Sequence, residues 1–424
     1  MLRLLSLVFY NYIRLRIFII IIICFSLILS PGFFSYNYSS CVNLIDTRLG
    51  DILVLLTLVL FFFSLVVVIK FTDPTIIFLC VFIQIVLVLT FKVRKVLMFY
   101  FSFEASIIPM LLIIIKRGYR PERYTAALWI VVYTVAGRLP FLFIILISFS
   151  RSLVTSIEGR VKGFIFSLVV LMPFIVKFPL FGVHYWLPLA HVEAPLVGRI
   201  LLAGILLKLG GYGFFVLLTI FNLRGVFLTR LVIWSLTGRV VVCFHIISSP
   251  DIKKLIALRR VAHINVSIVG LRLNRSSSVT SGKIILVSHG LCRALIFYLA
   301  NSGYLVRGSR SLIIIKGMLN IIPIFCLWLI LYCSVNIGVP PSLSFIRELL
   351  LCPGLLYMSS WGIILLIGGL FIAASYSIYL YYAVCHGFNN EWRNKSFDLK
   401  GSDHILLRLS LIGSFTLIFL VDLF

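Results

Sequence analysis

Long apolar runs follow one another along the whole chain, and they constrain its fold more than any motif does. A segment needs about 20 mainly apolar residues to cross the hydrocarbon core of a bilayer. Of the 424 residues, 62% are hydrophobic and 12% are charged, against about 25% charged residues in an average soluble domain. One globular core stops growing at roughly 250–300 residues. The sequence therefore predicts a multispanning membrane protein and excludes a soluble enzyme.

The runs and their polar breaks predict about 13 membrane spans, or 14 if the first run forms two short helices. These spans lie near residues 5–30, 52–69, 74–92, 95–116, 123–149, 163–193, 195–221, 226–249, 252–271, 281–301, 311–351, 354–385 and 404–422. The first run ends in SPGFF without a small-residue cleavage site, so we expect a span there and not a signal peptide. The short connections leave no room for a soluble domain.

Two of the predicted spans are too long for one helix and are interrupted by proline. One contains LVVLMPFIVKFPLFGVHYWLPLAHVEAP, and the other contains LWLILYCSVNIGVPPSLSFIRELLL. Proline removes a backbone donor and breaks the helix. Non-helical backbone at membrane depth is tolerated only where protein or water surrounds it. Broken helices at corresponding places in two halves of a chain indicate an inverted-repeat transporter, although a proline kink alone also occurs in inert spans.

Ionisable residues inside the apolar runs are the candidate functional groups, because each costs roughly 2.5–3.5 kcal/mol at a helix centre on insertion scales. They are Glu104, Lys177, Lys208, Glu348, His263 and His289. Burial disfavours the charged form of acids and bases alike, so a row of such groups can pass a proton in small steps. The alternatives are static ion pairs between helices and, for either histidine, a hydrogen-bonded packing role.

Other kinds of site find no support in the sequence. None of the nine cysteines stands in a CxxC pair, and no HExxH or GxxxxGK[ST] motif occurs, so we expect inert thiols and no metal, ATP or flavin site. The net charge of +25 comes from basic residues scattered among apolar runs. They form no stripe with interleaved aromatic residues, so we expect no nucleic-acid partner.

Six segments carry a resemblance to a known family. They read FEASIIPMLLIII, GYRPERYTAALWIVVYT, KFPLFGVHYWLPLAHVEAPLVGRILLAGILLKLGGYG, DIKKLIALRRVAHINVSIVGL, SHGLCRALIFYLANSGY and PPSLSFIRELL. Between about residues 95 and 385 they resemble, in order, the chain 4 family of mitochondrial NADH:ubiquinone oxidoreductase. Members of that family are antiporter-like subunits in the membrane arm of respiratory complex I.

The resemblance implies an all-α polytopic membrane protein of about 13–14 helices, with two inverted five-helix repeats that each contain a broken helix. It implies N-terminal helices at 1–94, a proton-translocating core at 95–385 and a polar loop with a C-terminal helix at 386–424. The first repeat begins near residue 74. The part before Glu104 is shorter than in many relatives, which leaves open whether one of the usual first helices is present.

The resemblance also implies residue roles. The family's essential glutamate falls on Glu104, its broken-helix lysine on Lys177, its central lysine on Lys208, its second broken-helix acid on Glu348 and its relay histidines on His263 and His289. The pair of Glu104 and Lys177 would set the proton affinity of Lys208. Protons would then pass through a histidine and water to Glu348, driven by quinone reduction elsewhere in the complex.

The implied partners are the other membrane-arm subunits, chiefly two sister antiporter-like subunits, and the lipid of the mitochondrial inner membrane. This chain would bind no cofactor, since NADH and ubiquinone are used elsewhere in the complex. Two alternatives stay open. One is a subunit of an Mrp-type cation/proton antiporter, and the other is a degenerate subunit that only scaffolds the arm.

Several arginines stand where relatives usually have a small residue, often serine. They are Arg138, Arg199, Arg259, Arg260, Arg293 and Arg347. Six guanidinium groups near helix centres would cost roughly 15–20 kcal/mol on the insertion scale, more than the stability of about 5–15 kcal/mol of a typical domain. In several invertebrate mitochondrial codes AGA and AGG specify serine, which gives the hypothesis that these positions are serine in the living protein. The alternative is genuine arginine paired with neighbouring subunits or lipid.

Overall fold

The computed structural model describes residues 47–69, 74–93, 96–118, 121–150, 164–221, 226–273, 275–387 and 401–423. The span expected near 5–30 lies outside these residues, as does most of the polar stretch at 387–403. Within them the chain is helical, and the β-structure there is a single isolated bridge between Asp251 and Ser311. The expectation of an all-α membrane protein is confirmed.

The helices keep the order in which the apolar runs predicted them. They are α2 (Thr47–Ile69), α3 (Pro74–Lys92), α4 (Val96–Ala105), α5 (Ile107–Arg117), α6 (Arg123–Ser150), α8 (Phe164–Lys177), α9 (Trp186–Glu193), α10 (Leu196–Leu201), the π-helical turn η1 (Leu202–Leu206), α11 (Leu207–Ile220), α12 (Val226–Ile247), α13 (Ile252–Arg272), α14 (Ser276–Arg307), α15 (Leu312–Ile315), α16 (Met318–Ile321), α17 (Pro323–Ile337), α18 (Leu343–Met358), α19 (Ser360–Cys385), α20 (Gly401–Thr416) and the 3₁₀ segment η3 (Leu417–Leu423). Eight helices in the described part are long and apolar enough to cross a membrane.

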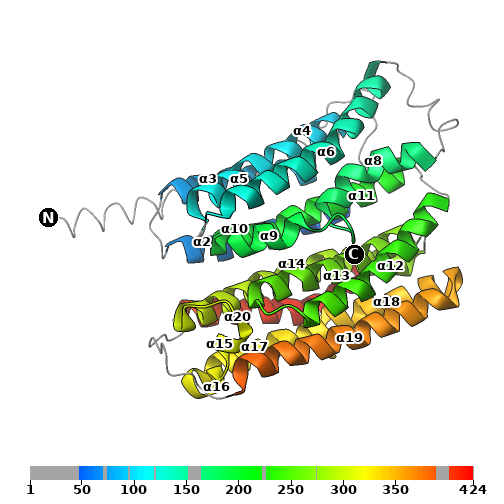
Figure 1. Ribbon diagram of the computed structural model, residues 1–424. Coiled ribbons are helices and arrows are strands. Elements are labelled where there is room, and N and C mark those ends of the chain that lie inside the picture. The colour runs from blue at the N-terminus through cyan, green and yellow to red at the C-terminus, as the bar shows by residue number, and fades with distance from the viewer. Residues whose placement is uncertain are drawn as a thin grey trace.

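Burial divides these helices into a central and a peripheral set. The most apolar stretches of the span Leu196–Ile220 and of the long helix α14 are wholly buried, whereas only a third of the corresponding stretch is buried in α6 and in α19. Figure 1 shows α9, α10 and α11 beside α13 and α14 in the middle of the molecule, with α3, α5 and α6 on one side and α18 and α19 on the other. The central helices are therefore the ones able to shelter ionisable groups from lipid.

The first predicted break is present. Helix α8 ends at Lys177, irregular backbone follows, and α9 begins at Trp186. The indole nitrogen of Trp186 donates to the carbonyl of Val176 at 3.1 Å, and the amide of Leu180 donates to Ile175 O at 3.4 Å. Backbone groups freed by the break are thus bonded inside the protein, as hydrocarbon depth requires.

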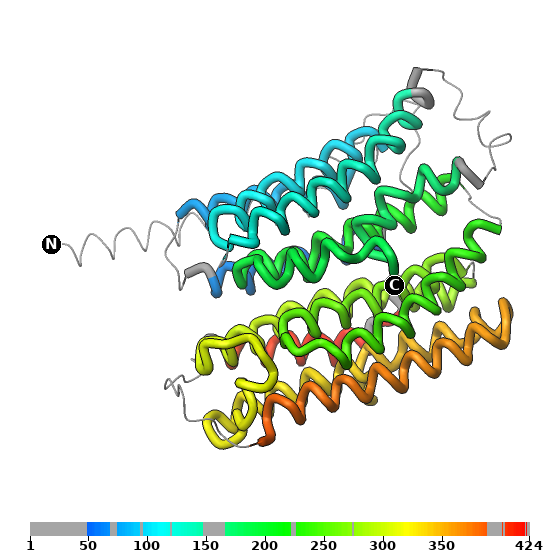
Figure 2. The backbone as a smooth tube through the Cα atoms, in the orientation of Figure 1, coloured from blue at the N-terminus to red at the C-terminus, as the bar shows by residue number. Residues whose placement is uncertain are grey.

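The second break differs in detail from the expectation. Helices α16 and α17 meet at a bend of 116°, which Figure 2 shows as a tight turn of the tube. The described backbone then leaves α17 at Gly338, where φ is +94°, and α18 begins at Leu343. The separation of spans expected between residues 351 and 354 is wrong, since α18 continues through Pro353 to Met358. The true boundary is Ser359, whose hydroxyl caps α19 by accepting from Gly362 N.

Glycine allows α11 to approach the first break closely. A Cβ added at Gly210 would lie 2.8 Å from Phe178 Cβ, 2.9 Å from Phe178 N and 3.2 Å from Lys177 C. Backbone cannot give way as a flexible side chain can. The contact therefore places the helix that carries Lys208 directly against the end of the helix that carries Lys177.

We expect Gly210→Ala to destabilise the subunit by about 1–3 kcal/mol, because the added methyl group overpacks this backbone contact. Gly368→Ala in α19 is the matched control, since nothing lies within 4 Å of a Cβ there. The measurement is the thermal midpoint of the subunit in the detergent-solubilised complex. Equal midpoints for the two variants would contradict the packing argument.

Candidate functional site

The amine of Lys177 is buried where α8 ends. Its Nζ donates to Phe103 O and to Ser106 Oγ, each at 3.2 Å, and lies 3.4 Å from the centroid of the Phe103 ring. Phe103 and Ser106 flank Glu104 in the chain, so the expected partner of this amine is on the same segment. In the described structure, however, the bonds of Lys177 go to neutral acceptors.

The carboxylate of Glu104 forms an ion pair with an arginine and not with Lys177. Its Oε1 lies 3.5 Å from Arg138 Nη1, and 35% of the Glu104 side chain is exposed on the isolated chain. Arg138 comes from α6 and also donates through Nε to Thr134 O at 2.8 Å. The structure therefore brings Glu104 and Lys177 into one neighbourhood, where Glu104 is paired with Arg138.

Lys208 lies two residues beyond the end of the π-helical turn η1. Its Nζ donates to the carbonyl of Ala203, inside that turn, at 2.8 Å. A π-helical turn is rare and often marks a functional site, because it changes the pairing of carbonyls along the helix. Only 3% of Lys208 is exposed, so this carbonyl replaces water as the partner of the amine.

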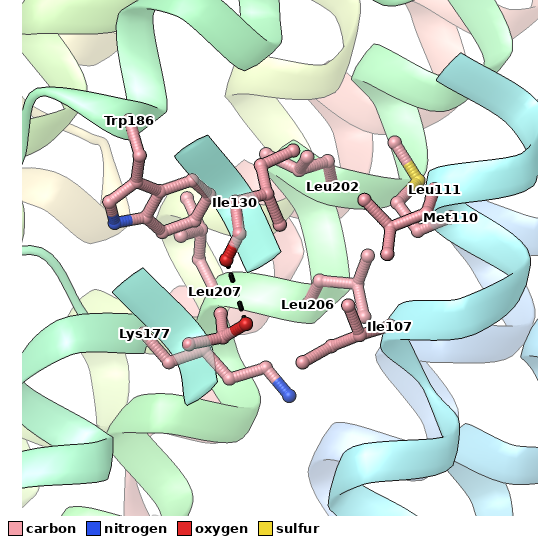
Figure 3. A pocket seen from close by; sticks show the side chains of 10 residues that line it. Ile107, Met110, Leu111, Ile130, Lys177, Trp186, Leu202, Leu206 and Leu207 are labelled. Atoms are coloured by element: carbon pink, nitrogen blue, oxygen red, sulfur yellow. Dashed lines mark hydrogen bonds between the residues drawn. The ribbon is translucent and has the colours of Figure 1, made fainter. Parts of the chain in front are cut away.

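A mainly apolar pocket lies beside Lys177. Its walls include Lys177 and Thr134 together with Leu202, Leu206 and Leu207 of the η1–α11 segment. In Figure 3 the Lys177 amine is the charged end among mainly apolar side chains. The segment that carries Lys208 thus forms part of the wall around the Lys177 amine.

The histidines meet on the other side of Lys208. The ring centroids of His263 from α13 and His289 from α14 are 4.8 Å apart. His263 Nε2 lies 3.3 Å from the hydroxyl of Tyr376, and its Nδ1 lies 3.3 Å from Arg347 Nη2. Arg347 also contacts His289 Nε2, and it lies 3.2 Å from Glu348 Oε1. The structure thus brings both histidines and Glu348 around one guanidinium.

The second carboxylate lies at the second break. A Cβ at Gly338 would be 3.1 Å from Glu348 Oε2, so the carboxylate faces the residue at which α17 ends. Only 16% of the Glu348 side chain is exposed. The two glutamates are therefore the more accessible of the six groups, while the lysines and histidines are buried.

Two further residues join this row, although the sequence reading did not select them. His191 from α9 is fully buried, accepts at Nε2 from Arg260 Nη1 at 2.7 Å, and stacks on Phe297 with the ring centroids 5.2 Å apart. Tyr376 from α19 contacts His263. The signal for His191 was available, since it is an ionisable residue in an apolar run, the same criterion that selected His263.

Metal binding has no geometric basis in the part of the chain that the structure describes. There, no three His, Cys, Asp or Glu side chains come close enough to hold an ion. The described cysteines are free thiols, nearly all of them buried.

Known proteins are similar in sequence to this chain over most of its length. The transmembrane family described as NADH:quinone oxidoreductase/Mrp antiporter matches residues 93–373. NADH-ubiquinone oxidoreductase chain 4 of Albinaria caerulea is 35% identical over 395 residues, which are 91% of this chain and 90% of that protein. The same chain of Artemia franciscana is 36% identical over 306 residues, which are 72% of this chain and 78% of that protein.

Solved structures share the fold. A chain of respiratory complex I from Thermus thermophilus with bound NADH superposes with a TM-score of 0.76 at 21% identity, covering 94% of this chain and 88% of that chain. A chain of the Mrp complex from Dietzia sp. superposes with a TM-score of 0.77 at 13% identity, covering 89% of this chain and 82% of that chain.

We expect Ser106→Ala to cost more stability than a matched buried serine does. The Ser106 hydroxyl donates to Phe103 O at 2.7 Å and also accepts from Lys177, and a hydrogen bond to a charged group contributes about 1.5–3 kcal/mol. Ser64→Ala is the control, because that hydroxyl makes the same bond to the carbonyl three residues earlier, at 2.7 Å. The thermal midpoint of the solubilised complex measures both.

The excess loss should disappear when Ser106→Ala is made in a Lys177→Met background, since the double-mutant cycle isolates the pair. An excess that persists without the amine would show that the Ser106–Lys177 contact carries no stabilisation.

Proposed function

Since the chain belongs to the NADH:quinone oxidoreductase/Mrp antiporter family, and within it to the chain 4 family of NADH-ubiquinone oxidoreductase, we propose that its buried row of ionisable groups is a proton path. The chain is a membrane-arm subunit of the proton-translocating NADH:ubiquinone reductase. In this function it couples electron transfer elsewhere in the complex to proton movement across the membrane.

One observation carries the proposal: Lys177, Lys208, His263 and His289 are each no more than 6% exposed. Each such group within an apolar bundle is costly and defaults to a functional role. They also lie on helices that contact one another in order, from α8 to α11, and from α11 to α13 and α14. A proton can therefore cross the interior by short transfers between neighbours.

The partners of the lysines favour exchange over static pairing. Lys177 binds a carbonyl and a hydroxyl, and Lys208 binds a carbonyl. Either amine can release a proton without leaving an uncompensated carboxylate beside it. A scaffold subunit held together by ion pairs would instead place carboxylates against these amines.

The proposed sequence of steps begins at Glu104. Its carboxylate, on the same segment as the groups that bind Lys177, stabilises the protonated amine when it turns toward Lys177 and releases that amine when it turns away. The proton then passes toward Lys208, on the segment that walls the pocket beside Lys177. From Lys208 it reaches His289 or His263, which meet beside Glu348, and leaves from the carboxylate at the second break.

The environment follows from the same proposal. We place the chain in the mitochondrial inner membrane, beside two sister antiporter-like subunits, with NADH and ubiquinone bound elsewhere in the complex. The partly exposed Glu104 would then face a neighbouring subunit. Purification of the native complex tests this placement, because an Mrp-type antiporter would lack the quinone-reducing activity that copurifies with a complex I subunit.

We expect Lys208→Met to abolish proton translocation through this subunit while leaving assembly nearly intact. Methionine keeps the length and apolar stem of the side chain but has no titratable proton. Lys254→Met is the control, since Lys254 is exposed at the start of α13. Proton flux and quinone turnover are measured together in vesicles that contain the reassembled complex.

Normal flux at normal quinone turnover in Lys208→Met would exclude Lys208 as an obligatory carrier. Equal losses in both variants would trace the effect to assembly, and the abundance of the complex on native gels reports that separately.

A further inference from the structure

Eight arginines of the described helices are buried, and none of them is more than 9% exposed. One of them, Arg307, is the last residue of α14 and donates to Lys316 O at 2.9 Å. The other seven are Arg138, Arg199, Arg239, Arg259, Arg260, Arg293 and Arg347. Arg239 joins the six positions that stand out in the sequence. Such burial keeps lipid headgroups and neighbouring subunits away from the guanidinium groups, so any partners must come from inside the chain.

Four of these arginines lack hydrogen-bond partners inside the described part of the chain as well. Within the described part of the chain, all three guanidinium nitrogens of Arg259 and of Arg293 lack a hydrogen-bond partner, and so do two nitrogens each of Arg239 and Arg260. Arg259 lies over the Tyr376 ring at 5.2 Å and beside the Cys333 thiol, but a ring face and a thiol sulfur are weak acceptors for a guanidinium. Buried polar groups are normally bonded, and a buried charge without partners is strongly unfavourable.

The arginines also repel one another and a relay residue. Arg293 is close enough to Arg259, Arg260 and Arg347 for their charges to repel it. The charges of Arg260 and Arg293 likewise repel that of Lys208. A proton carrier at the centre of a cluster of permanent cations would be driven out of its charged form. The cluster therefore opposes the chemistry that the rest of the site favours.

Two other arginines take partners from the relay. Arg138 holds the carboxylate of Glu104. Arg347 contacts both histidines and Glu348. Guanidinium is a donor that keeps its proton in proteins, so it can block an acceptor but cannot pass a proton on.

Serine is the polar residue that this protein buries in helices without difficulty. The hydroxyls of Ser64, Ser235, Ser267 and Ser302 each donate to the carbonyl three residues earlier at 2.6–2.7 Å. A helical serine thus brings its own partner and needs no carboxylate. It is also small enough for helices to pack closely.

We infer that all seven positions carry serine in the functional protein, and that hydroxyls there border the proton path. AGA and AGG specify serine in several invertebrate mitochondrial codes, so one codon reassignment accounts for every position. Arg138→Ser would free Glu104 to pair with Lys177, and Arg347→Ser would free His263 and His289 for proton transfer. The role of the hydroxyls rests on the proposed function, whereas the serine assignment does not.

The codons give the first test, with controls inside the same chain. We expect AGA or AGG at all seven positions, and CGN at Arg123 and Arg310, whose guanidinium groups have partners within the chain. Arg123 donates to Gly118 O at 3.0 Å, and Arg310 lies 3.3 Å from Glu193 and 3.5 Å from Asp251. A CGN codon at position 239, 259, 260 or 293 would overturn the inference.

Mass spectrometry of the native complex gives the decisive test. Chymotryptic peptides spanning residues 255–300 should carry the lower mass of serine at positions 259, 260 and 293, and trypsin should fail to cut after them. It should still cut after position 310. Peptides with arginine at 259, 260 or 293 would overturn the inference whatever the codons are. Because the readout is a mass, it stands or falls separately from proton pumping.

Discussion

An amine without water needs a protein acceptor, and the central helices are shaped by that requirement. At hydrocarbon depth every backbone carbonyl is normally used within its own helix. Lys177 Nζ therefore reaches Phe103 O and Ser106 Oγ, where α4 ends and α5 begins, and Lys208 Nζ reaches Ala203 O within the π-helical turn η1. Both buried amines thus find their acceptors where regular α-helical backbone is interrupted.

The remaining helices bring these two places together. Gly210 lets α11 pack against the backbone at the end of α8, and the central helix α14 carries His289 past α11 toward α18. The peripheral helices α6 and α19 cover this interior while exposing apolar side chains such as Leu139 and Phe371. The site is thus a property of the central packing, and lipid is kept away from it by helices with ordinary apolar surfaces.

The sequence predicted those features that hydrocarbon thickness controls. Apolar length located the spans, and proline located the first break near Lys177. The prediction from sequence failed where side-chain hydrogen bonds decide where a helix begins or ends. SSSVTS looked like a loop, yet it begins α14, where Ser278 Oγ donates to Leu273 O at 2.6 Å. Pro353 indicated a boundary between two spans, but α18 continues through it to Met358. The boundary is Ser359, which caps the start of α19. No sequence pattern marked the π-helical turn, which depends on packing around Lys208. The inverted repeat stays a prediction.

The arginines show how the two kinds of reasoning reinforce each other. Composition alone says that so many cations in apolar runs are improbable, but it allows partners from lipid or from other subunits. The structure excludes partners from lipid and from other subunits, because this chain encloses the guanidinium groups. Four of them lack hydrogen bonds within the described part of the chain as well. It also shows that Arg138 and Arg347 occupy the acceptors a proton path would need. Replacing these cations by hydroxyls leaves Lys177, Lys208 and the two histidines as the basic groups of the axis, and that is the condition under which a proton can be held there and released.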